Sequence, residues 1–310
     1  MTANILFAAR NDRWAEYEAP LRAALDAAGL DYVLATDLSP ETVDYIVYAP
    51  NSRLRDFTPF TRLRAVLNLW AGVEEVTGNA TLNAPLARMV DHGLTRGMVE
   101  WVTGHVLRHH LGLDAHIHGL NGEWRRAVPP LAEDRGVSIL GLGALGRACA
   151  TTLASLGFDV AGWSRTAKDI DGIRTTHGPD GLAEALGRAE ILVLLLPDTP
   201  ATQNTLNAAT LALMPQGAAV INPGRGTLID DKALLAALDS GRIGHATLDV
   251  FRTEPLPPDH RYWSHPSVTV TPHIASETRP GTSSEVIADN VRRGESGEPF
   301  LHLVDRRNGY

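Results

Sequence analysis

The chain has 310 residues, of which 44% are hydrophobic and 21% are charged, a composition typical of a globular protein with a full apolar core. Its formal net charge of -8 argues against nucleic acid as the main partner, because surfaces that bind nucleic acid are basic. The single cysteine, Cys149, excludes an internal disulfide, and no apolar run is long enough to span a membrane, so we expect a cytoplasmic protein without a membrane partner.

Short apolar runs follow one another in the first third of the chain, and segments with helical spacing separate them. The runs are NILFAAR, YVLAT, YIVYAP, AVLNLW and LARMV. Near-continuous runs of Val, Ile and Leu that alternate with helices indicate parallel strands buried on both faces. The first third therefore predicts an α/β, doubly wound sheet.

The stretch from residue 93 to residue 120 predicts a long helix, because Val99, Val102 and Val106 keep helical spacing. This helix would carry the chain into a second domain. His105 and His109 lie four residues apart on it, a spacing that can chelate a metal ion. No acidic residue stands between them as in the HExxH pattern, and no cysteine lies nearby, so we expect no metal and favour a polar helix face or a subunit contact.

A second series of apolar runs begins at residue 137 and predicts a second parallel sheet. The runs are VSILGLG, FDVAGW, ILVLLLP, AAVINPG, HATLDV and VTVTPH. A final helical segment starts at SSEVIADNVRRGESGEPF, after the last run. If this segment returns to the first sheet, the first domain is discontinuous.

The first run of the second series ends in a glycine motif with G-x-G-x-x-G spacing, formed by Gly141, Gly143 and Gly146. In such a motif the first glycine allows a tight turn, the second lets the backbone approach a pyrophosphate, and the third lets helix and strand pack closely. Backbone N–H groups near Ala144 and Leu145 would point at the anion from a helix N-terminus. Because a strand precedes the motif and a helix follows it, we predict dinucleotide binding rather than a plain strand-to-helix turn.

The tip of the next strand indicates which dinucleotide binds. An NAD site usually has Asp or Glu there, whereas this chain has Ser164, Arg165 and Thr166 in GWSRT. An arginine and two hydroxyls suit a 2'-phosphate, so NADP is the predicted cofactor and NAD the weaker alternative; a solvated arginine at a strand end is the other interpretation. Leu196 and Pro197, which end the run ILVLLLP, are also predicted cofactor-binding residues.

Three polar residues follow later strands of the same series: Arg225 in NPGRG, Glu254 in DVFRTEPLP and His273 in TPHIAS. The carboxyl ends of parallel strands line the ligand crevice of an open α/β sheet, so we expect the three to converge there. An arginine can bind a carboxylate through two hydrogen bonds, and a histidine can deliver a proton near neutral pH. Singly, each could be a surface charge, a loop carboxylate or a core histidine, but together they predict reduction of a 2-oxo acid.

The motifs GLGALG, NPGRGTLIDDKALLAAL, ATLDVFRTEPLP and VTPHIAS resemble, in this order, those of the D-2-hydroxyacid dehydrogenase family. GWSRT, TPHIASETRP and the terminal VDRRNGY are most similar to its glyoxylate/hydroxypyruvate reductase A branch. The resemblance implies two doubly wound parallel-sheet domains, the larger a Rossmann dinucleotide-binding domain. Residues 1–98 and 277–310 would form the substrate domain and residues 99–276 the NADP-binding domain. A homodimer is also implied.

The same resemblance implies roles for the polar residues. Arg225 would bind the substrate carboxylate and carbonyl, His273 would donate the proton, and Glu254 would be the partner of His273. Asp249, which matches the family's Asp in LDVF, would hold the nicotinamide carboxamide.

The segment LWAGVEEV resembles the family's loop whose backbone amides bind the substrate carboxylate, and it assigns that role to Gly72 and Val73. Trp70 stands where the family commonly has Gly, and Glu74 replaces Asp. A tryptophan here either shapes the substrate pocket or packs into the core.

The predicted function is reduction of small 2-oxo acids such as glyoxylate or hydroxypyruvate with NADPH. Two alternatives stay open at this point. Some relatives sense the dinucleotide and act as protein-binding scaffolds, as transcriptional corepressors do, and others act on a different small anion such as a phosphonate or formate. The presence of all three polar residues favours a hydroxyacid enzyme over both.

Overall fold

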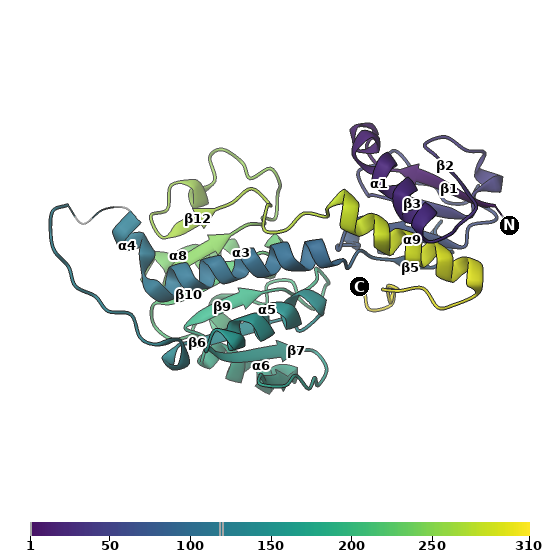
Figure 1. The fold of residues 1–310 in the computed structure, drawn as a ribbon. Helices are drawn as coiled ribbons and strands as arrows, with labels where there is room; N and C mark the ends of the chain where they lie inside the picture. Colours follow the sequence, from purple (N-terminus) through teal and green to yellow (C-terminus); the bar gives the residue numbers. More distant parts are fainter. Residues whose placement is uncertain (1, 118, 120) are drawn as a thin grey trace. The chain divides into compact units, whose positions relative to one another are not determined.

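The computed structural model describes residues 2–117, 119 and 121–310, and it divides the chain into two compact units (Figure 1). Unit 1 comprises Met1–Leu94 and Glu277–Tyr310, and unit 2 comprises Thr95–Ser276. The first change of unit falls within helix α3 (His92–Leu111), four residues before the predicted boundary. None of the helices in the described ranges combines the length and the apolar character that a membrane crossing requires.

Unit 1 is built on a five-stranded parallel sheet with the strand order β2-β1-β3-β4-β5. The strands are β1 (Ala3–Ala8), β2 (Tyr32–Ala35), β3 (Tyr45–Tyr48), β4 (Ala65–Asn68) and β5 (Leu86–Ala87). The predicted run LARMV contributes only the two residues of β5 to this sheet. Because the strand order reverses direction at β1, the carboxyl ends of β1 and β3 flank a topological switch point, where α/β proteins bind ligands.

The helices of unit 1 cover the faces of this sheet. They are α1 (Trp14–Ala27), α2 (Glu74–Thr77) and α9 (Pro280–Ser296), with short 3-10 turns at Asn11–Arg13 and Pro40–Thr42. Tyr17 and Leu21 of α1 and Ile287 of α9 pack in one core with Ile5 and Val47 of the sheet. In Figure 1, α1 and α9 lie side by side, so the carboxyl-terminal segment belongs to the same sheet as the first strand.

Unit 2 is built on a seven-stranded parallel sheet with the strand order β12-β11-β10-β9-β6-β7-β8. The strands are β6 (Gly136–Leu140), β7 (Asp159–Ser164), β8 (Arg174–His177), β9 (Ile191–Leu194), β10 (Ala218–Asn222), β11 (Ile243–Leu248) and β12 (Val268–Val270). The apolar runs predicted all of these strands except β8. The sequence of β8, RTTH, is polar, and such a strand is tolerated because it lies at an edge of the sheet.

Helices cover both faces of the second sheet. Besides α3 they are α4 (Leu113–Ile117), α5 (Ala144–Ser155), α6 (Gly178–Gly187), α7 (Ala208–Leu211) and α8 (Asp231–Asp239), with 3-10 turns at Ala132–Asp134, Gly226–Leu228 and Arg261–Trp263. Neighbouring residues of one strand enter different cores: Ile139 packs with α3 and α5, and Leu140 packs with α6 and α8. Unit 2 is therefore doubly wound, and the predicted fold class is confirmed.

The predicted long helix is shorter than the stretch from 93 to 120. α3 ends at Leu111 because Gly112 adopts the left-handed conformation, with φ at +63°, and a separate short helix follows. His109 Nε2 lies 2.9 Å from Thr247 Oγ1 of β11, and burial lowers the pKa of His109 to about 3. The His105 ring packs in a tilted arrangement against Trp101 of its own helix, with ring centroids 4.3 Å apart. His109 thus contacts the sheet of unit 2, and His105 contacts a neighbour on its own helix.

Candidate active site

The glycine motif forms the turn between β6 and α5, and two of its glycines are sterically required. Gly141 has φ at +106°, and a methyl group there would lie 2.4 Å from the carbonyl oxygen of Leu195. At Gly146 a methyl group would lie 1.8 Å from the carbonyl oxygen of Gly141. By contrast, no atom lies within 4 Å of the corresponding position at Gly143, so the middle of the turn has open space around it.

The N-terminus of α5 supplies the polar groups of this turn. Gly143 is its N-cap residue, and no side chain caps the helix there. The N–H groups of the first turn, at Ala144 and Leu145, are therefore left for another acceptor, and the helix dipole favours a negative one. Open space beside uncapped N–H groups fits the pyrophosphate of a dinucleotide.

The residues after β9 lie against the glycine turn. The N–H of Leu195 donates to the carbonyl oxygen of Leu140 at 2.8 Å, and Leu196 is buried beside Gly141. The carbonyl oxygen of Pro197 accepts a hydrogen bond from the hydroxyl of Thr202 at 2.6 Å. The structure thus brings Leu196 to the predicted cofactor turn and fixes the backbone that follows it.

The tip of β7 differs in detail from what its sequence indicated. The side chain of Ser164 is buried, and its hydroxyl donates to the carbonyl oxygen of Thr166 at 2.7 Å. This hydroxyl therefore stabilises the turn, and it donates its proton within the chain rather than to a ligand. Arg165 and Thr166 are exposed, so these two side chains remain accessible to a ligand at the strand tip.

Arg225 lies in a turn that a buried asparagine organises. Asn222, the last residue of β10, donates from Nδ2 to the carbonyl oxygen of Arg225 at 2.9 Å and accepts at Oδ1 from the N–H of Gly224 at 3.1 Å. The guanidinium of Arg225 donates from Nη1 to the carbonyl oxygen of Gly224 at 2.7 Å. Asn222 was not among the predicted site residues, although a polar residue that ends an apolar strand was a visible signal.

Glu254 and His273 form a hydrogen-bonded pair. His273 Nδ1 lies 2.7 Å from Glu254 Oε2, and Glu254 Oε1 accepts from the N–H of Phe251 at 2.8 Å. The hydrogen bond with Glu254 raises the pKa of His273 above its ordinary value, although burial acts in the opposite direction. Burial by itself would raise the pKa of Glu254, but the hydrogen bonds from His273 and Phe251 outweigh it and lower that pKa.

Arg225 belongs to the same electrostatic cluster as this pair. Gly226, the next residue, lies against the backbone of Phe251, whose N–H donates to Glu254. The positive charge of Arg225 lowers the pKa of both His273 and Glu254. The His273 side chain is 51% exposed, so its second ring nitrogen can reach a ligand. The three residues predicted to converge are thus brought together within unit 2, as a cation, a proton carrier and a carboxylate.

Asp249 is fully buried beneath the loop that carries His273. Its Oδ1 accepts hydrogen bonds from Thr271 Oγ1 at 2.6 Å and from the N–H of Ile274 at 2.8 Å, and its Oδ2 accepts from the N–H of Ala275 at 2.9 Å. The N–H of His273 donates to the Asp249 carbonyl oxygen at 2.8 Å. The carboxylate therefore fixes the loop around His273, a role that the sequence analysis did not assign to it.

We expect Asp249→Asn to lower both stability and turnover. An amide NH₂ in place of one carboxylate oxygen faces backbone donors, and leaving a buried donor unpaired costs about 1 to 3 kcal/mol. Thermal melting and steady-state kinetics would measure the two effects. Asp171→Asn, at an exposed position of the same unit, is the matched control and should change neither. An Asp249→Asn variant with unchanged melting temperature and turnover would contradict this role.

The loop predicted to bind the substrate carboxylate lies in unit 1 and follows β4. Asn68, the last residue of β4, is buried and donates from Nδ2 to the carbonyl oxygens of Trp70 at 2.8 Å and Gly72 at 3.0 Å. Val73 is buried and precedes α2. Asn68 thus fixes the backbone of this loop through side-chain hydrogen bonds, as Asn222 fixes the turn at Arg225. Trp70 is 36% exposed and lines a cavity, so it does not pack into the core.

The family model for the D-isomer specific 2-hydroxyacid dehydrogenase, NAD binding domain, matches residues 104–275. This chain belongs to the D-isomer specific 2-hydroxyacid dehydrogenase family. It is an NAD(P)-dependent 2-hydroxyacid dehydrogenase, and the predicted family and enzyme class are confirmed.

Individual relatives agree with this assignment. A glyoxylate/hydroxypyruvate reductase A from Serratia proteamaculans is 38% identical over 257 residues, which are 80% of this chain and 82% of the relative. A D-isomer specific 2-hydroxyacid dehydrogenase from Xanthobacter autotrophicus, crystallised with NADPH and MES, is 39% identical with a TM-score of 0.92, and the match covers 100% of both chains. An NADPH-dependent glyoxylate/hydroxypyruvate reductase from Sinorhizobium meliloti, crystallised with NADP and sulfate, is 35% identical with a TM-score of 0.83 and also covers 100% of both chains.

Proposed function

We propose that this enzyme reduces small 2-oxo acids, glyoxylate and hydroxypyruvate, to 2-hydroxy acids and prefers NADPH over NADH. The observation that carries the proposal is the Glu254–His273 pair at 2.7 Å beside the positive charge of Arg225. The names of the similar proteins from Serratia and Sinorhizobium support the substrate class. In this proposal unit 1 is the substrate domain and unit 2 is the NADP-binding domain.

The proposed chemistry assigns one task to each polar residue. Bound NADPH supplies the hydride that reaches the carbonyl carbon. Glu254 holds Nδ1 of His273 and stabilises the charged ring, so Nε2 is the atom that protonates the carbonyl oxygen. Arg225 binds the substrate carboxylate and stabilises the negative charge that develops on the carbonyl oxygen.

The residues proposed to hold the cofactor and the substrate are those singled out in the sequence. The proposed cofactor contacts are Gly141, Gly143, Ala144, Leu145, Gly146, Arg165, Thr166, Leu196 and Pro197, while Ser164 and Asp249, whose buried side chains are hydrogen-bonded within the chain, hold the strand tip and the His273 loop in place. The backbone N–H groups of Gly72 and Val73 bind the carboxylate in this proposal. The homodimer and the cytoplasmic location also stay predictions, and the mass of the protein in solution tests the first of them.

A substrate screen tests the proposed function directly. Glyoxylate, hydroxypyruvate and pyruvate would each be supplied with NADPH and, separately, with NADH, and nicotinamide absorbance would be followed. We expect the largest kcat/KM for glyoxylate or hydroxypyruvate with NADPH. Equal rates with all three acids, or a preference for NADH, would contradict the corresponding part of the proposal.

Arg165→Asp should reduce the preference for NADPH. One charge-assisted hydrogen bond to a phosphate contributes about 1.5 to 3 kcal/mol, so its loss should weaken NADPH binding at least about tenfold. The new carboxylate also repels the phosphate, while NADH binding should stay the same or improve. Dissociation constants of both cofactors for wild type and variant measure the change.

Arg174→Asp is the matched control for this charge reversal. Arg174 is exposed and begins β8, which runs parallel to β7, so it lies at the opposite end of the strands from Arg165. The ratio of NADPH to NADH affinity should be unchanged in this variant. If the ratio also stays unchanged in Arg165→Asp, Arg165 is only a solvated surface residue.

A further inference from the structure

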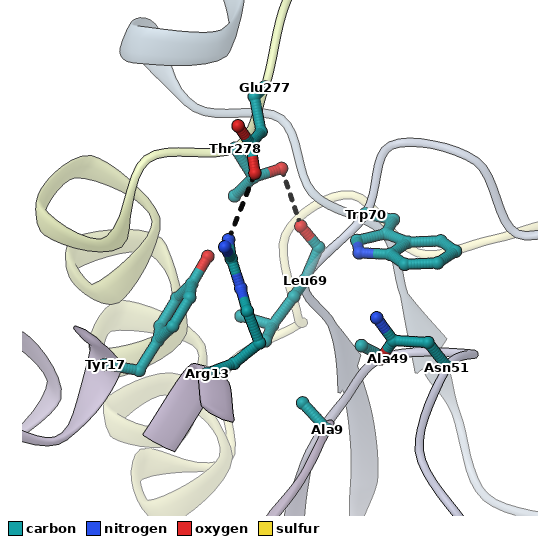
Figure 2. A pocket seen from close by; sticks show the side chains of 9 residues that line it. All are labelled: Ala9, Arg13, Tyr17, Ala49, Asn51, Leu69, Trp70, Glu277 and Thr278. Atoms are coloured by element: carbon teal, nitrogen blue, oxygen red, sulfur yellow. Dashed lines mark hydrogen bonds and ion pairs between the residues drawn. The ribbon is translucent and has the colours of Figure 1, made fainter. Parts of the chain in front are cut away.

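A small cavity lies in unit 1 at the carboxyl ends of three parallel strands (Figure 2). Ala9 follows β1, Asn51 lies three residues after β3, and Trp70 lies two residues after β4, and all three line the cavity. Its volume is about 50 Å³, which is room for a few water molecules or for one small substituent of a ligand. The position is the switch-point edge of the sheet, where α/β proteins bind their ligands.

One side of the cavity is fixed by buried residues. Tyr17 of α1 and Leu69 are almost fully buried, and the hydroxyl of Thr278 donates to the carbonyl oxygen of Leu69 at 2.8 Å. Figure 2 shows these side chains facing the same space from α1, from the end of β4 and from the segment before α9. The shape of the cavity is therefore set by the core of unit 1.

Two hydrogen-bond donors face the cavity without an acceptor in the described part of the chain. Asn51 accepts from the N–H of Arg10 at Oδ1, at 3.3 Å, so its Nδ2 remains available. Trp70 Nε1 makes no protein hydrogen bond either within the described residues. Figure 2 shows both nitrogens turned toward the space between Trp70 and Arg13. A ligand group with an oxygen acceptor would satisfy both donors.

The charges around the cavity disfavour a second carboxylate on the ligand. The guanidinium of Arg13 lies 2.9 Å from Glu16 Oε2 and 3.3 Å from Glu277 Oε1. One cation between two carboxylates leaves a net negative charge at this wall. The cavity thus offers donors to a neutral oxygen, while the two carboxylates offset the charge of Arg13 that would otherwise attract an anion.

The cavity adjoins the loop proposed to bind the substrate carboxylate. Asn68 Nδ2 donates to the carbonyl oxygens of both Trp70 and Gly72, so the cavity wall and the loop are held by one amide group. A 2-oxo acid whose carboxylate lies at Gly72 and Val73 can extend its C3 substituent only over a short distance. Trp70 is two residues from Gly72 in the chain, and the same Asn68 amide holds the backbone of both.

We propose that this cavity binds the C3 hydroxymethyl group of the substrate, with Asn51 and Trp70 as donors to its hydroxyl oxygen. This subsite rests on the proposed function. The preferred substrates of the enzyme would then be 2-oxo acids with a neutral, hydroxylated C3, such as hydroxypyruvate. A 2-oxo acid with a second carboxylate, such as oxaloacetate, is disfavoured in this proposal, because Glu16 and Glu277 offset the charge of Arg13. Glyoxylate has no C3 and leaves the cavity unused.

The test measures kcat/KM for hydroxypyruvate and for glyoxylate in the same preparations. Asn51→Ala removes one donor, and Trp70→Phe removes the indole N–H while it keeps an aromatic wall. Each should lower the ratio of hydroxypyruvate to glyoxylate kcat/KM about three- to tenfold, the effect of one hydrogen bond. Asn83→Ala, at an exposed position of unit 1 away from the cavity, should leave the ratio at the wild-type value.

A second pair of variants tests the charge argument. Glu16→Gln and Glu277→Gln, separately and combined, remove the negative charges beside Arg13. The rate with oxaloacetate relative to hydroxypyruvate should rise, most in the double variant. Thermal melting of every variant separates an effect on the ratio from a loss of folded protein.

The outcomes distinguish the subsite from the function on which it rests. If wild type reduces both acids and neither Asn51→Ala nor Trp70→Phe changes their ratio, the subsite is wrong and the proposed function stands. If wild type reduces neither acid, both proposals are wrong. A lower ratio in both donor variants together with a higher oxaloacetate rate in the double variant supports the subsite.

Discussion

Replacement of His273 by glutamine is expected to lower turnover with hydroxypyruvate by about 10²- to 10⁴-fold, the usual contribution of a general acid. The side chain would lose the ionisable nitrogen that protonates the carbonyl oxygen. NADPH should still bind, because the glycine turn and the N-terminus of α5 are formed by other residues. Steady-state kinetics and NADPH titration of the variant measure both effects, and near-normal turnover would remove His273 from the mechanism.

The role of His273 also predicts how the reductive rate changes with pH. Reduction needs protonated His273, whose pKa is raised by Glu254, so the reductive rate should fall as the pH rises through that raised value. Hydroxyacid oxidation needs the neutral ring and should show the opposite limb. Glu254→Gln removes the main cause of the raised pKa, so the reductive limb should move to lower pH. Glu184→Gln, at an exposed position of α6, should leave the limb in place.

The strands were predictable because buried parallel strands have a distinct composition. Runs such as ILVLLLP and AAVINPG are apolar on both faces; in the first of them Leu192 and Val193 pack into two different helical layers. The polar edge strand β8 could not be found in this way. The end of α3 was missed for another reason: helical spacing continues past Gly112, and only the left-handed backbone there shows that the helix has ended.

The polar cluster was predictable as a set of residues, but its arrangement was not. Arg225, Glu254 and His273 each follow a strand, and parallel strands place such residues at one edge. The hydrogen-bond partners came only from the structure. In the sequence Asn68 and Asn222 are visible only as polar residues that end apolar strands, with no sign of their partners. Asp249 was predicted as a ligand contact, whereas its carboxylate is buried under a loop. The contacts of Asn68 and Asn222 are local turns and those of Asp249 are long-range, and neither kind leaves a periodic pattern in the sequence.

Replacement of Arg225 by methionine is expected to have the other large effect. Two charge-assisted hydrogen bonds to a carboxylate contribute about 3 to 6 kcal/mol together, so kcat/KM for hydroxypyruvate should fall by about 10²- to 10⁴-fold. Arg225→Lys keeps the charge but cannot donate two parallel hydrogen bonds from one planar group, so its kcat/KM should lie between those of wild type and Arg225→Met. Arg174→Met, at an exposed arginine that begins β8 in the same unit, is the control for loss of a positive charge.

The two Arg225 variants should also differ in their pH profiles. The positive charge of Arg225 lowers the pKa of His273, so its removal should raise that pKa and move the reductive limb to higher pH, the direction opposite to Glu254→Gln. Arg225→Lys keeps the charge and should leave the limb near its wild-type position, even though kcat/KM falls. Rates measured across pH for Arg225→Met, Arg225→Lys and Glu254→Gln therefore separate substrate binding by Arg225 from its effect on the pKa of His273. A limb that did not move in Arg225→Met would mean that Arg225 and His273 do not share one site.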